Sequence, residues 1–413
     1  MSRIKIRHFG PIKEGFSEND GWIDIKKATV FIGNQGSGKS SVAKLISTLM
    51  WIEKVLTRGD FSEREFTATK FRNTHCGYHR IDNYFIKGKT EISYEGDSYS
   101  FVYESDDKFH ICKIEDGLNQ YSLPQIMYVP AERNFISMVN KPNLIKDLPD
   151  ALLTFLTEYD NAKKQIKGVF NLPINNALLE YQKQSDIVKV KGEGYDVKLS
   201  EASSGFQSLV PLYIVSKYLS ESVHEQARNA TKMSSDEIRR FEDGVKSIWA
   251  DLTLSDTQRR AALSALSARF NKSAFINIVE EPEQNLFPSS QMKIMQTLLE
   301  LNNSLESNKL IITTHSPYFI NFLSIAIQGA YLKDIILSSQ NSQALLSEFN
   351  TILSEKSVIQ GDLAVIYQLD ETTGSIEKLP STLGIPSDRN YLNDLLRSGN
   401  QIFDKLLELE EKI

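Results

Sequence analysis

One stretch of the sequence has the residue types and the spacing that phosphate binding requires. Residues 33–40 read Gly-Asn-Gln-Gly-Ser-Gly-Lys-Ser and match the pattern G-x-x-x-x-G-K-[ST]. Glycines let the backbone N–H groups turn toward a β-phosphate, while Lys39 reaches the β and γ oxygens and Ser40 can ligate magnesium. The residues predicted to contact a nucleotide here are Gly33, Asn34, Gln35, Gly36, Ser37, Gly38, Lys39, Ser40 and Ser41. We therefore expect ATP and Mg²⁺ as the ligands of this loop.

Two carboxylates follow the apolar run 275–279, which is typical of a strand buried on both faces. Ligands gather at the carboxyl ends of parallel strands, so Glu280 and Glu281 stand where a nucleotide would bind. We expect Glu280 to hold the magnesium through water and Glu281 to orient and deprotonate the attacking water. An acidic loop without function is the alternative, and the phosphate loop in the same chain disfavours it.

A histidine follows a second buried run, 310–314. His315 comes 34 positions after Glu281, the length of one helical crossover between neighbouring parallel strands. This spacing predicts that His315 lies beside the same site, although an isolated histidine after a strand is more often structural.

A small polar loop opens the helical pattern 205–223. Its serines and glycine suit a helix N-terminus that binds phosphate, and a simple helix cap is the alternative. The predicted ligand residues here are Ser203, Ser204, Gly205 and Gln207.

The surrounding pattern places these residues on an α/β fold. Strands are predicted at 4–6, 22–25, 28–32, 90–94, 99–103, 275–279, 310–314, 364–368 and 375–378, with two more within 186–199. Helices are predicted at 40–53, 148–167, 205–223, 288–301 and 387–411. We expect a mixed central sheet flanked by helices, with an antiparallel β lobe from about 60 to 115.

The segment 225–271 reads as an inserted, charged helical hairpin. Ser234 and Glu237 form a capping box, and apolar residues then recur at spacings of three and four. The chain is thus predicted to divide into a first part of one domain (1–224), the hairpin (225–271) and a second part of that domain (272–413). The arginines of the hairpin, which are Arg239, Arg240, Arg259 and Arg260, either dock a partner or form a solvated surface.

The order of the phosphate loop, Ser-Ser-Gly-Phe-Gln, Glu-Glu-Pro-Glu and Thr-His-Ser-Pro resembles the ABC-type ATPases, in their SMC, RecF and OLD-like branch. The resemblance spans essentially the whole chain and includes Tyr128-Val-Pro-Ala-Glu-Arg133. It implies a P-loop ABC-ATPase head that clamps two ATP molecules between two copies of the chain. By this resemblance Ser204 and Gly205 touch the γ-phosphate of the other copy, His315 is the γ-phosphate switch, and 283–288 form a dimer contact.

The resemblance also implies a role. The chain has no room for SMC-length arms, no D-x-D pair after His315 for a fused Toprim nuclease, and no later histidine for an anticodon nuclease. It therefore looks most like the ATPase of anti-phage systems such as PARIS, with Septu less similar. Such an ATPase would form a homo-oligomer, hold a separately encoded effector nuclease, for example of Toprim type, and respond to a phage-encoded trigger. The alternatives are a RecF-like DNA repair ATPase and a nucleotide-locked scaffold with negligible turnover.

Departures from the family pattern favour slow or conditional turnover. Glu280 stands where aspartate is usual, Phe206 where a second glycine is common, and Gln35 where asparagine is usual. Gln125 is a candidate for the family's Q-loop glutamine, with its register undetermined.

Composition agrees with a globular protein and sets few other limits. The 413 residues are 41% hydrophobic and 24% charged, with a net charge of −6, so DNA is not a favoured partner. With only two cysteines and no stretch near 18 apolar residues, we expect a cytoplasmic protein without a membrane segment.

Three weaker signals remain open. Arg3, Lys5 and Arg7 form either a basic ridge or a solvated strand face. His75, Cys76 and His79 form either a metal site, for which the spacing is poor, or a polar loop. The end helix, with Leu395, Ile402, Phe403 and Leu406, forms core or a subunit interface.

Overall fold

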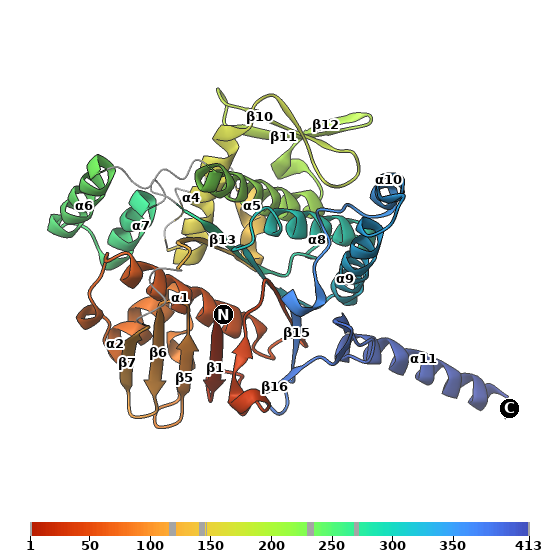
Figure 1. Cartoon of the computed structure of the whole chain (residues 1–413), viewed down its shortest axis with the longest axis horizontal. Coiled ribbons are helices and arrows are strands. Elements are labelled where there is room, and N and C mark those ends of the chain that lie inside the picture. The colour runs from red at the N-terminus through yellow and green to blue at the C-terminus, as the bar shows by residue number, and fades with distance from the viewer. Residues whose placement is uncertain are drawn as a thin grey trace.

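A seven-stranded mixed sheet forms the centre of the chain, as a computed structural model of it shows (Figure 1). The structure describes residues 2–114, 121–139, 145, 147–228, 235–267 and 272–411. The strand order is β2 (Gly15–Phe16), β16 (Ser375–Lys378), β15 (Ala364–Leu369), β4 (Ala28–Gly33), β14 (Lys309–Thr314), β13 (Ala274–Glu280) and β8 (Pro124–Val129). Strands β15, β4, β14, β13 and β8 run parallel, and β16 is antiparallel to β15. The predicted α/β fold with a mixed central sheet is confirmed.

Both faces of this sheet are covered, because its strands are apolar at successive positions. Phe31, Ile278 and Ile311 face the helix α1 (Lys39–Thr57), within the core that it shares with the N-terminal lobe. Val30 and Val279 point the other way, into the larger core. That second layer contains α4 (Asp150–Gln165), α5 (Ser204–Arg228), α8 (Pro288–Asn302) and α9 (Pro317–Leu337). The buried runs seen in the sequence thus correspond to strands between two helical layers.

The N-terminal lobe is a five-stranded antiparallel sheet packed on the other side of α1. Its order is β3 (Ile23–Asp24), β1 (Arg3–Arg7), β5 (Glu91–Glu95), β6 (Tyr99–Glu104) and β7 (Lys108–Lys113). The hairpin predicted at 90–103 is confirmed by the β5–β6 pairing. Arg3 on β1 forms an ion pair with Glu95 at 2.6 Å and stacks over Trp22, so the expected basic ridge is partly neutralised within the chain.

The prediction that β structure begins near residue 60 was wrong. The segment before β5 consists of short helical turns, namely η2 (Glu63–Glu65), α2 (Ala68–Lys70), η3 (Phe71–Cys76), η4 (Gly77–His79) and η5 (Asp82–Tyr84). They bury Phe71 and Cys76 in the core that contains α1, while His75 lies against the rings of Trp51 and Phe66. His79 accepts or donates a hydrogen bond at Ser47 Oγ, 3.1 Å away. Among the described residues no cluster of His, Cys, Asp or Glu suits a metal ion.

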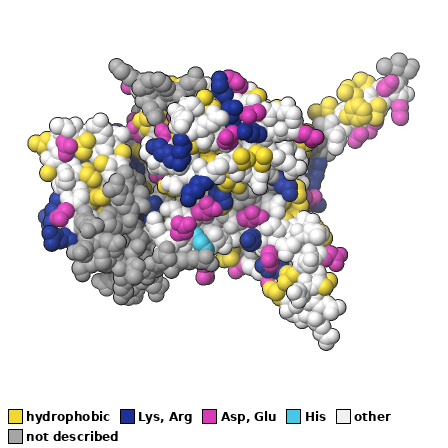
Figure 2. All heavy atoms as spheres, turned by 90° about the horizontal axis from the view of Figure 1, so that it is seen from above, with side chains coloured by type: hydrophobic (Ala, Val, Ile, Leu, Met, Phe, Trp, Pro, Cys, Tyr) yellow, Lys and Arg dark blue, Asp and Glu magenta, His cyan; other side chains and the backbone are white. Residues whose placement is uncertain are grey.

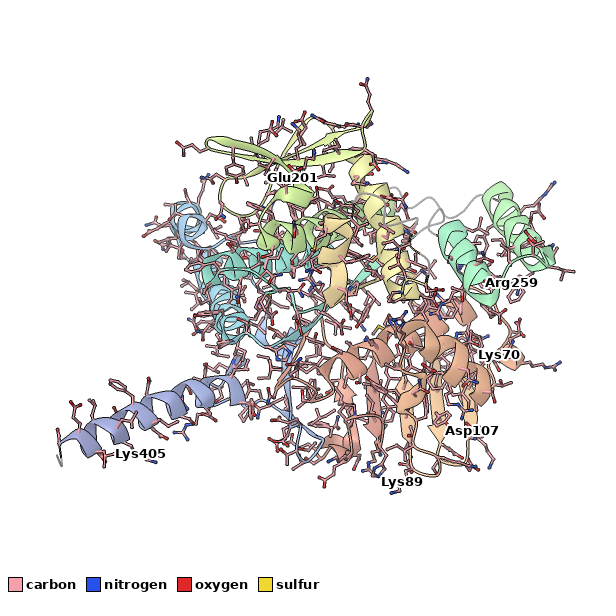
Figure 3. All side chains as sticks on the ribbon, turned by 180° about the vertical axis from the view of Figure 1, so that it is seen from behind. Lys70, Lys89, Asp107, Glu201, Arg259 and Lys405 are labelled. Carbon is pink, nitrogen blue, oxygen red and sulfur yellow. The ribbon has the colours of Figure 1, made fainter. Side chains whose placement is uncertain are left out.

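Two helices form the hairpin, α6 (Ser235–Ala250) and α7 (Asp256–Ser267), on the left of Figure 1. The proposed capping residue Ser234 and the side chain of Arg240 lie outside the described residues. Arg260 is buried between the rings of Trp51 and Tyr78, at 3.8 and 4.2 Å from their centroids. Arg259, labelled in Figure 3, lies over the Trp249 ring of the same hairpin. The idea that these two arginines dock a partner is therefore wrong, because their cationic groups hold the hairpin together and onto the head.

A small antiparallel sheet leads into α5. It consists of β9 (Val169–Asn171), β10 (Leu178–Gln182), β11 (Ile187–Gly192) and β12 (Tyr195–Lys198). The two strands predicted within 186–199 are β11 and β12, while β9 and β10 were not predicted. After β12, the turn η8 (Leu199–Glu201) brings the chain to the first turn of α5, near the labelled Glu201 in Figure 3.

The helices α9 and α10 (Ser342–Ile352) were not predicted from the sequence. By length and composition alone α9 could cross a membrane, with 44% of its most apolar window buried inside the protein. The expectation that no stretch approaches this length was wrong. A core helix passes the same test, and α9 packs against α8 and α10.

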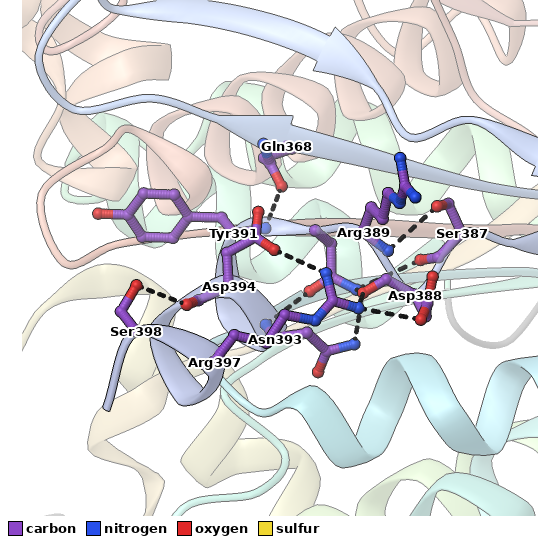
Figure 4. Close-up of polar contacts among 10 residues, drawn as sticks. Gln368, Ser387, Asp388, Arg389, Tyr391, Asn393, Asp394, Arg397 and Ser398 are labelled. Carbon is purple, nitrogen blue, oxygen red and sulfur yellow. Dashed lines mark hydrogen bonds and ion pairs between the residues drawn. The ribbon is translucent and has the colours of Figure 1, made fainter. Parts of the chain in front are cut away.

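The chain ends in α11 (Tyr391–Glu410), which projects from the body (Figure 1). Figure 4 shows how its root is held: Tyr391 N donates to Gln368 on β15, and Arg397 pairs with Asp388 and Asp394. Further along, Ile402, Phe403 and Leu406 are exposed by about 60% (61%, 61% and 58%), and hydrophobic side chains lie along the arm in Figure 2. The side chain of Leu395 lies outside the described residues. The prediction that these side chains belong to the core of a single chain is wrong. The alternative, that they form a subunit interface, stays a prediction.

Candidate nucleotide site

The phosphate loop joins β4 to α1, where a nucleotide motif requires it. Gly33 ends β4, and Gly38 precedes the first residue of α1 with a φ of 101°. An added Cβ would lie 2.4 Å from the Leu369 carbonyl oxygen at Gly33 and 3.0 Å from an Ile12 carbon at Gly38. Only glycine fits these positions without displacing a neighbour. Asn34, Gln35 and Gly36 are exposed at the tip, Ser37 and Ser41 are buried, and Ser40 is half-buried in the first turn of α1.

Lys39 lies folded back over this loop. Its Nζ donates to the carbonyl oxygens of Gly33 at 3.0 Å and Asn34 at 2.8 Å. Burial lowers the pKa of Lys39 to about 8, and the charges of the nearby carboxylates, Glu281 first, oppose this shift. The Lys39 ammonium is thus held by backbone carbonyl oxygens, which phosphate oxygens would replace. Its pKa of about 8 is near physiological pH.

The predicted base and switch lie together. His315 Nε2 is 3.3 Å from Glu281 Oε1, and His315 Nδ1 is 3.4 Å from Lys39 Nζ. The contact with His315 lowers the pKa of Glu281, against the effect of burial, so this carboxylate is ionised at neutral pH. The pairing of β13 with β14 around the crossover α8 confirms the neighbouring-strand arrangement predicted from the spacing.

Glu281 also has an unusual backbone conformation, with a φ of 43°. Non-glycine residues pay an energetic penalty of about 1 kcal/mol or more in this region, and such residues concentrate at functional sites. Glu281 N donates to the Thr313 carbonyl at 2.8 Å, which helps to hold it in place.

Glu280 has the surroundings of a cation ligand. It is only 4% exposed, and its Oε2 accepts one long hydrogen bond from Ala131 N at 3.3 Å. Its Oε1 lacks a well-formed hydrogen bond, although the buried Tyr128 hydroxyl lies near this carboxylate, which helps to raise the pKa of the tyrosine. The hydroxyl of Ser37 is also buried without a partner. A buried carboxylate with a free oxygen is costly unless a cation or water satisfies it. These residues therefore fit Mg²⁺ with a nucleotide, held by Glu280 through water and by Ser40.

The loop before α5 is placed differently. Ser203 and Ser204 are exposed at the helix N-terminus, and Gly205 lies against the backbone of Asn285. The Gln207 side chain is buried and donates to the Ser200 carbonyl at 3.1 Å, so within one chain it supports the turn before the helix. Among the described residues no hydrogen bond joins Ser203, Ser204 or Gly205 to the phosphate loop. The ligand roles of these four residues stay predictions.

Three further residues contribute to the site in ways that the sequence analysis did not assign. Glu283, predicted only as part of a dimer contact, is half-buried, and its Oε1 accepts from His315 N at 2.6 Å. Glu371 accepts from Asn34 Nδ2 at 2.8 Å and from Tyr391 OH at 3.0 Å, which connects the phosphate loop to the root of α11. Arg133 donates to the backbone of both Glu280 and Glu281 at 2.7 Å. Only the phrase ending in Arg133 gave a sequence signal, through the family resemblance.

Gln125 is not the Q-loop residue. It pairs with Phe275 in the parallel β8–β13 ladder, five positions before Glu280. At about 3.3 Å per residue it lies roughly 16 Å from the carboxyl edge where the nucleotide residues gather. The register therefore overturns this candidate.

Comparison with known proteins gives one family match. Residues 255–320 match a profile described as an AAA ATPase domain, and this segment contains Glu280, Glu281 and His315. Among curated proteins no sequence matches the chain.

Solved structures similar to the chain include two SMC heads and one ATP-binding cassette. The SMC head domain from Thermotoga maritima has 10% identity, covers 92% of this chain and 98% of its own, and gives a TM-score of 0.38. An Smc head from Pyrococcus furiosus, bound to the C-terminal domain of ScpA, has 11% identity, coverages of 98% and 100%, and a TM-score of 0.36. A dimeric ATP-binding cassette in a post-hydrolysis state with ADP and Pi has 15% identity, coverages of 92% and 100%, and a TM-score of 0.30. At these scores the similarities carry no argument about function.

The sheet order and the phosphate loop together define the fold class of the chain. The chain has a P-loop α/β fold in which the loop strand β4 lies between β14 and β15, with Glu280 at the end of β13. Its residues 255–320 are similar to an AAA ATPase domain.

Proposed function

We propose that this protein binds and hydrolyses ATP as an ABC-type ATPase whose two copies enclose the nucleotides, and that it regulates a separate effector in prokaryotic anti-phage defence. The observation that carries the ATPase part is the contact of Glu281, His315 and Lys39 beside a glycine loop at one sheet edge.

The chemistry assigned to each residue follows from its position. Lys39 exchanges its carbonyl partners for the β- and γ-phosphate oxygens. Bound Mg²⁺ supplies positive charge to those oxygens. Glu281, ionised and fixed by its turn, orients a water molecule and accepts its proton. His315 lies between the base and the lysine, so it can donate to the γ-phosphate and report whether that phosphate is present.

The arrangement of the α5 loop supports a second copy in the site. Ser203 and Ser204 are exposed and have no contact with the phosphate loop of their own chain. Large apolar side chains near this edge are exposed as well, with Met138 at 57%, Phe287 at 75% and Tyr318 at 46%. Phe287 follows directly on the 281–286 turn that contacts Gly205. Exposed apolar groups beside a ligand surface are typical of a protein interface.

The ATPase proposal is tested with two variants of the purified chain. Lys39→Ala should abolish ATP binding, and Glu281→Gln should retain binding but trap an ATP-bound dimer, seen by light scattering as twice 46.9 kDa. A turnover rate that Glu281→Gln leaves unchanged would refute the role given to this base.

The defence proposal needs a cellular test. The chain is expressed with its neighbouring gene, and phage plaque formation and co-purification of the two products are measured. We expect protection that Lys39→Ala and Glu281→Gln abolish. Neither co-purification nor any effect on phage growth would overturn this part alone.

A RecF-like repair role makes a different prediction for the same purified chain. It requires salt-sensitive DNA binding that stimulates ATP turnover. Absence of both excludes it, and ATP binding without turnover would instead favour the nucleotide-locked scaffold.

A further inference from the structure

Arg133 is a fully buried arginine whose guanidinium lies between the turn 281–286, which we call the catalytic turn, and the α5 helix. Its exposed fraction is 0%. Nε donates to the Ser208 carbonyl at 3.1 Å, and Nη1 donates to the carbonyls of Pro130 at 3.2 Å and Glu280 at 2.7 Å. Nη2 donates to the Glu281 carbonyl at 2.7 Å. One planar group therefore connects three separate segments of backbone.

Such a group is expensive to bury, so its presence needs a reason. Burial lowers the pKa of Arg133 to about 10, and the carboxylates of Glu283, Glu281 and Glu280 oppose the shift. The side chain thus stays charged at neutral pH. All four of its hydrogen bonds go to backbone carbonyl oxygens, which a guanidinium fork holds at fixed angles, and none goes to a carboxylate.

The first turns of α5 are built to receive this contact. Pro211 lies inside the helix and has no N–H, so the Gln207 carbonyl loses its helical donor. Ser137 Oγ, on α3 (Asn134–Met138), donates to that carbonyl at 2.8 Å. The next carbonyl, that of Ser208, is the one that Arg133 contacts.

A third contact comes from the catalytic turn itself. Asn285 Nδ2 donates to Ser208 Oγ at 3.2 Å, and the Asn285 carbonyl oxygen would be 2.9 Å from a Cβ at Gly205. Asn285 also has a left-handed backbone, with a φ of 60°. The turn after Glu281 and the N-terminus of α5 are therefore in close contact.

We propose that Arg133 is a positioning residue that fixes Glu281 relative to the N-terminus of α5, with Ser137 and Asn285 as supporting contacts. We call these three residues the brace. Because Glu281 has a strained φ, its geometry depends on bonds such as that from Arg133 to its carbonyl. In the sandwich dimer the α5 N-terminus contacts the second copy's nucleotide, so the brace makes the catalytic carboxylate of one site dependent on the occupancy of the other. This consequence rests on the proposed function, whereas the brace itself does not.

The test compares two buried arginines. Arg133→Lys retains the charge but loses the fork, and we expect the ATP Kd to change less than about twofold while kcat falls by about 10- to 100-fold. Arg260→Lys is the control, because the Arg260 guanidinium is also packed inside the chain, between the Trp51 and Tyr78 rings, but outside the site. It should lower the melting temperature without lowering kcat. An Arg133→Lys enzyme with wild-type kcat, or with loss of ATP affinity as large as the loss of kcat, overturns the proposal.

A second readout is independent of turnover. Hydrogen exchange of the nucleotide-free chain should be faster in Arg133→Lys at the amides of both 204–208 and 281–287, and at neither in Arg260→Lys. If Arg133→Lys does not fold, Asn285→Ala and Ser137→Ala are measured instead, each with the same paired acceleration expected. Faster exchange confined to 131–138 would refute the brace. Absence of ATP turnover in the wild-type chain, with the paired exchange retained, would refute the proposed function alone.

Discussion

The imidazole of His315 lies 3.3 Å from the carboxylate of Glu281, through Nε2 and Oε1. The other ring nitrogen is 3.4 Å from Lys39 Nζ, so one ring contacts both the proposed base and the proposed phosphate ligand. The His315 backbone N–H donates to Glu283 Oε1 at 2.6 Å, which fixes the main chain at this residue. The three groups are thus positioned before any nucleotide binds.

Replacement of Glu281 by glutamine should lower ATP turnover by about 10²- to 10⁴-fold, the usual contribution of a general base. The His315 contact lowers the pKa of Glu281 below its ordinary value of 4.5, so the base is ionised at pH 5.5 and above. Any loss of turnover that is caused by protonation of Glu281 should therefore occur only in acid, as the pH falls through the lowered pKa of this carboxylate. A pH–rate profile of the wild-type chain measures this.

Glu132→Gln is the control for that experiment, since Glu132 is an exposed carboxylate near the site. It should have the wild-type rate and profile. A group that titrates near pH 7 and disappears in Glu281→Gln would contradict the low pKa of Glu281. The stability of the folded chain should change with pH in the same direction. The contact between Glu281 and His315 stabilises the chain above pH 4.5, and this contribution is lost as the carboxylate protonates at lower pH.

Binding of ATP should take up a proton at pH 8.5. Without nucleotide the pKa of Lys39 is lowered to about 8 by burial, so much of the amine is neutral at that pH. Contact with a triphosphate favours the charged form and raises this pKa. Titration calorimetry in two buffers of different ionisation enthalpy measures the uptake.

Lys39→Arg provides the comparison, because a guanidinium stays charged throughout this range. If the variant still binds ATP, its heat of binding should be the same in both buffers. Equal heats in the two buffers for the wild-type chain would contradict the lowered pKa.

Local sequence signals located the candidate site residues on the fold because each lies at a junction with a strong pattern. The glycine spacing at 33–40 and the buried runs before Glu280 and His315 have few alternative structures. Arg133 and Glu371 could not be assigned in this way. Their roles depend on partners 147 or more positions away, Glu280 for Arg133 and Asn34 for Glu371, and no local pattern encodes such contacts.

The wrong fold predictions have physical causes as well. The segment 63–84 was included in the predicted β lobe, yet Phe66 and Phe71 pack in the core that contains α1 and lie in or beside short helical turns. Helix α9 gave no amphipathic stripe because it is apolar on its exposed face as well as on its buried one, with Ile325 at 45% and Tyr331 at 59% exposed. Of the hairpin arginines, Arg260 is turned inward between two aromatic rings, whereas Arg239 is 81% exposed.

Truncation of Arg260 should destabilise the head by about 2–4 kcal/mol. Arg260→Ala removes a desolvated cation–π contact with Trp51 and Tyr78 and leaves a cavity between the rings. Urea denaturation followed by tryptophan fluorescence measures the free energy of unfolding. Arg239→Ala, at an 81% exposed side chain on α6, should change it by less than about 0.5 kcal/mol. Equal effects of the two variants would mean that the hairpin is not held by Arg260.

Charges placed on the distal arm should leave the stability of the head unchanged. Ile402 and Phe403 are each 61% exposed on the part of α11 beyond its polar root. Substitution of both by aspartate therefore removes little buried area, and the free energy of unfolding should change by less than about 1 kcal/mol. If α11 is a subunit interface, the same double variant should lower the mass of the assembly in light scattering. Leu252→Asp, at a 92% exposed leucine outside the arm, should leave that mass unchanged. A large loss of stability in the arm variant would show that these side chains are buried within one chain, against the exposed positions in the structure.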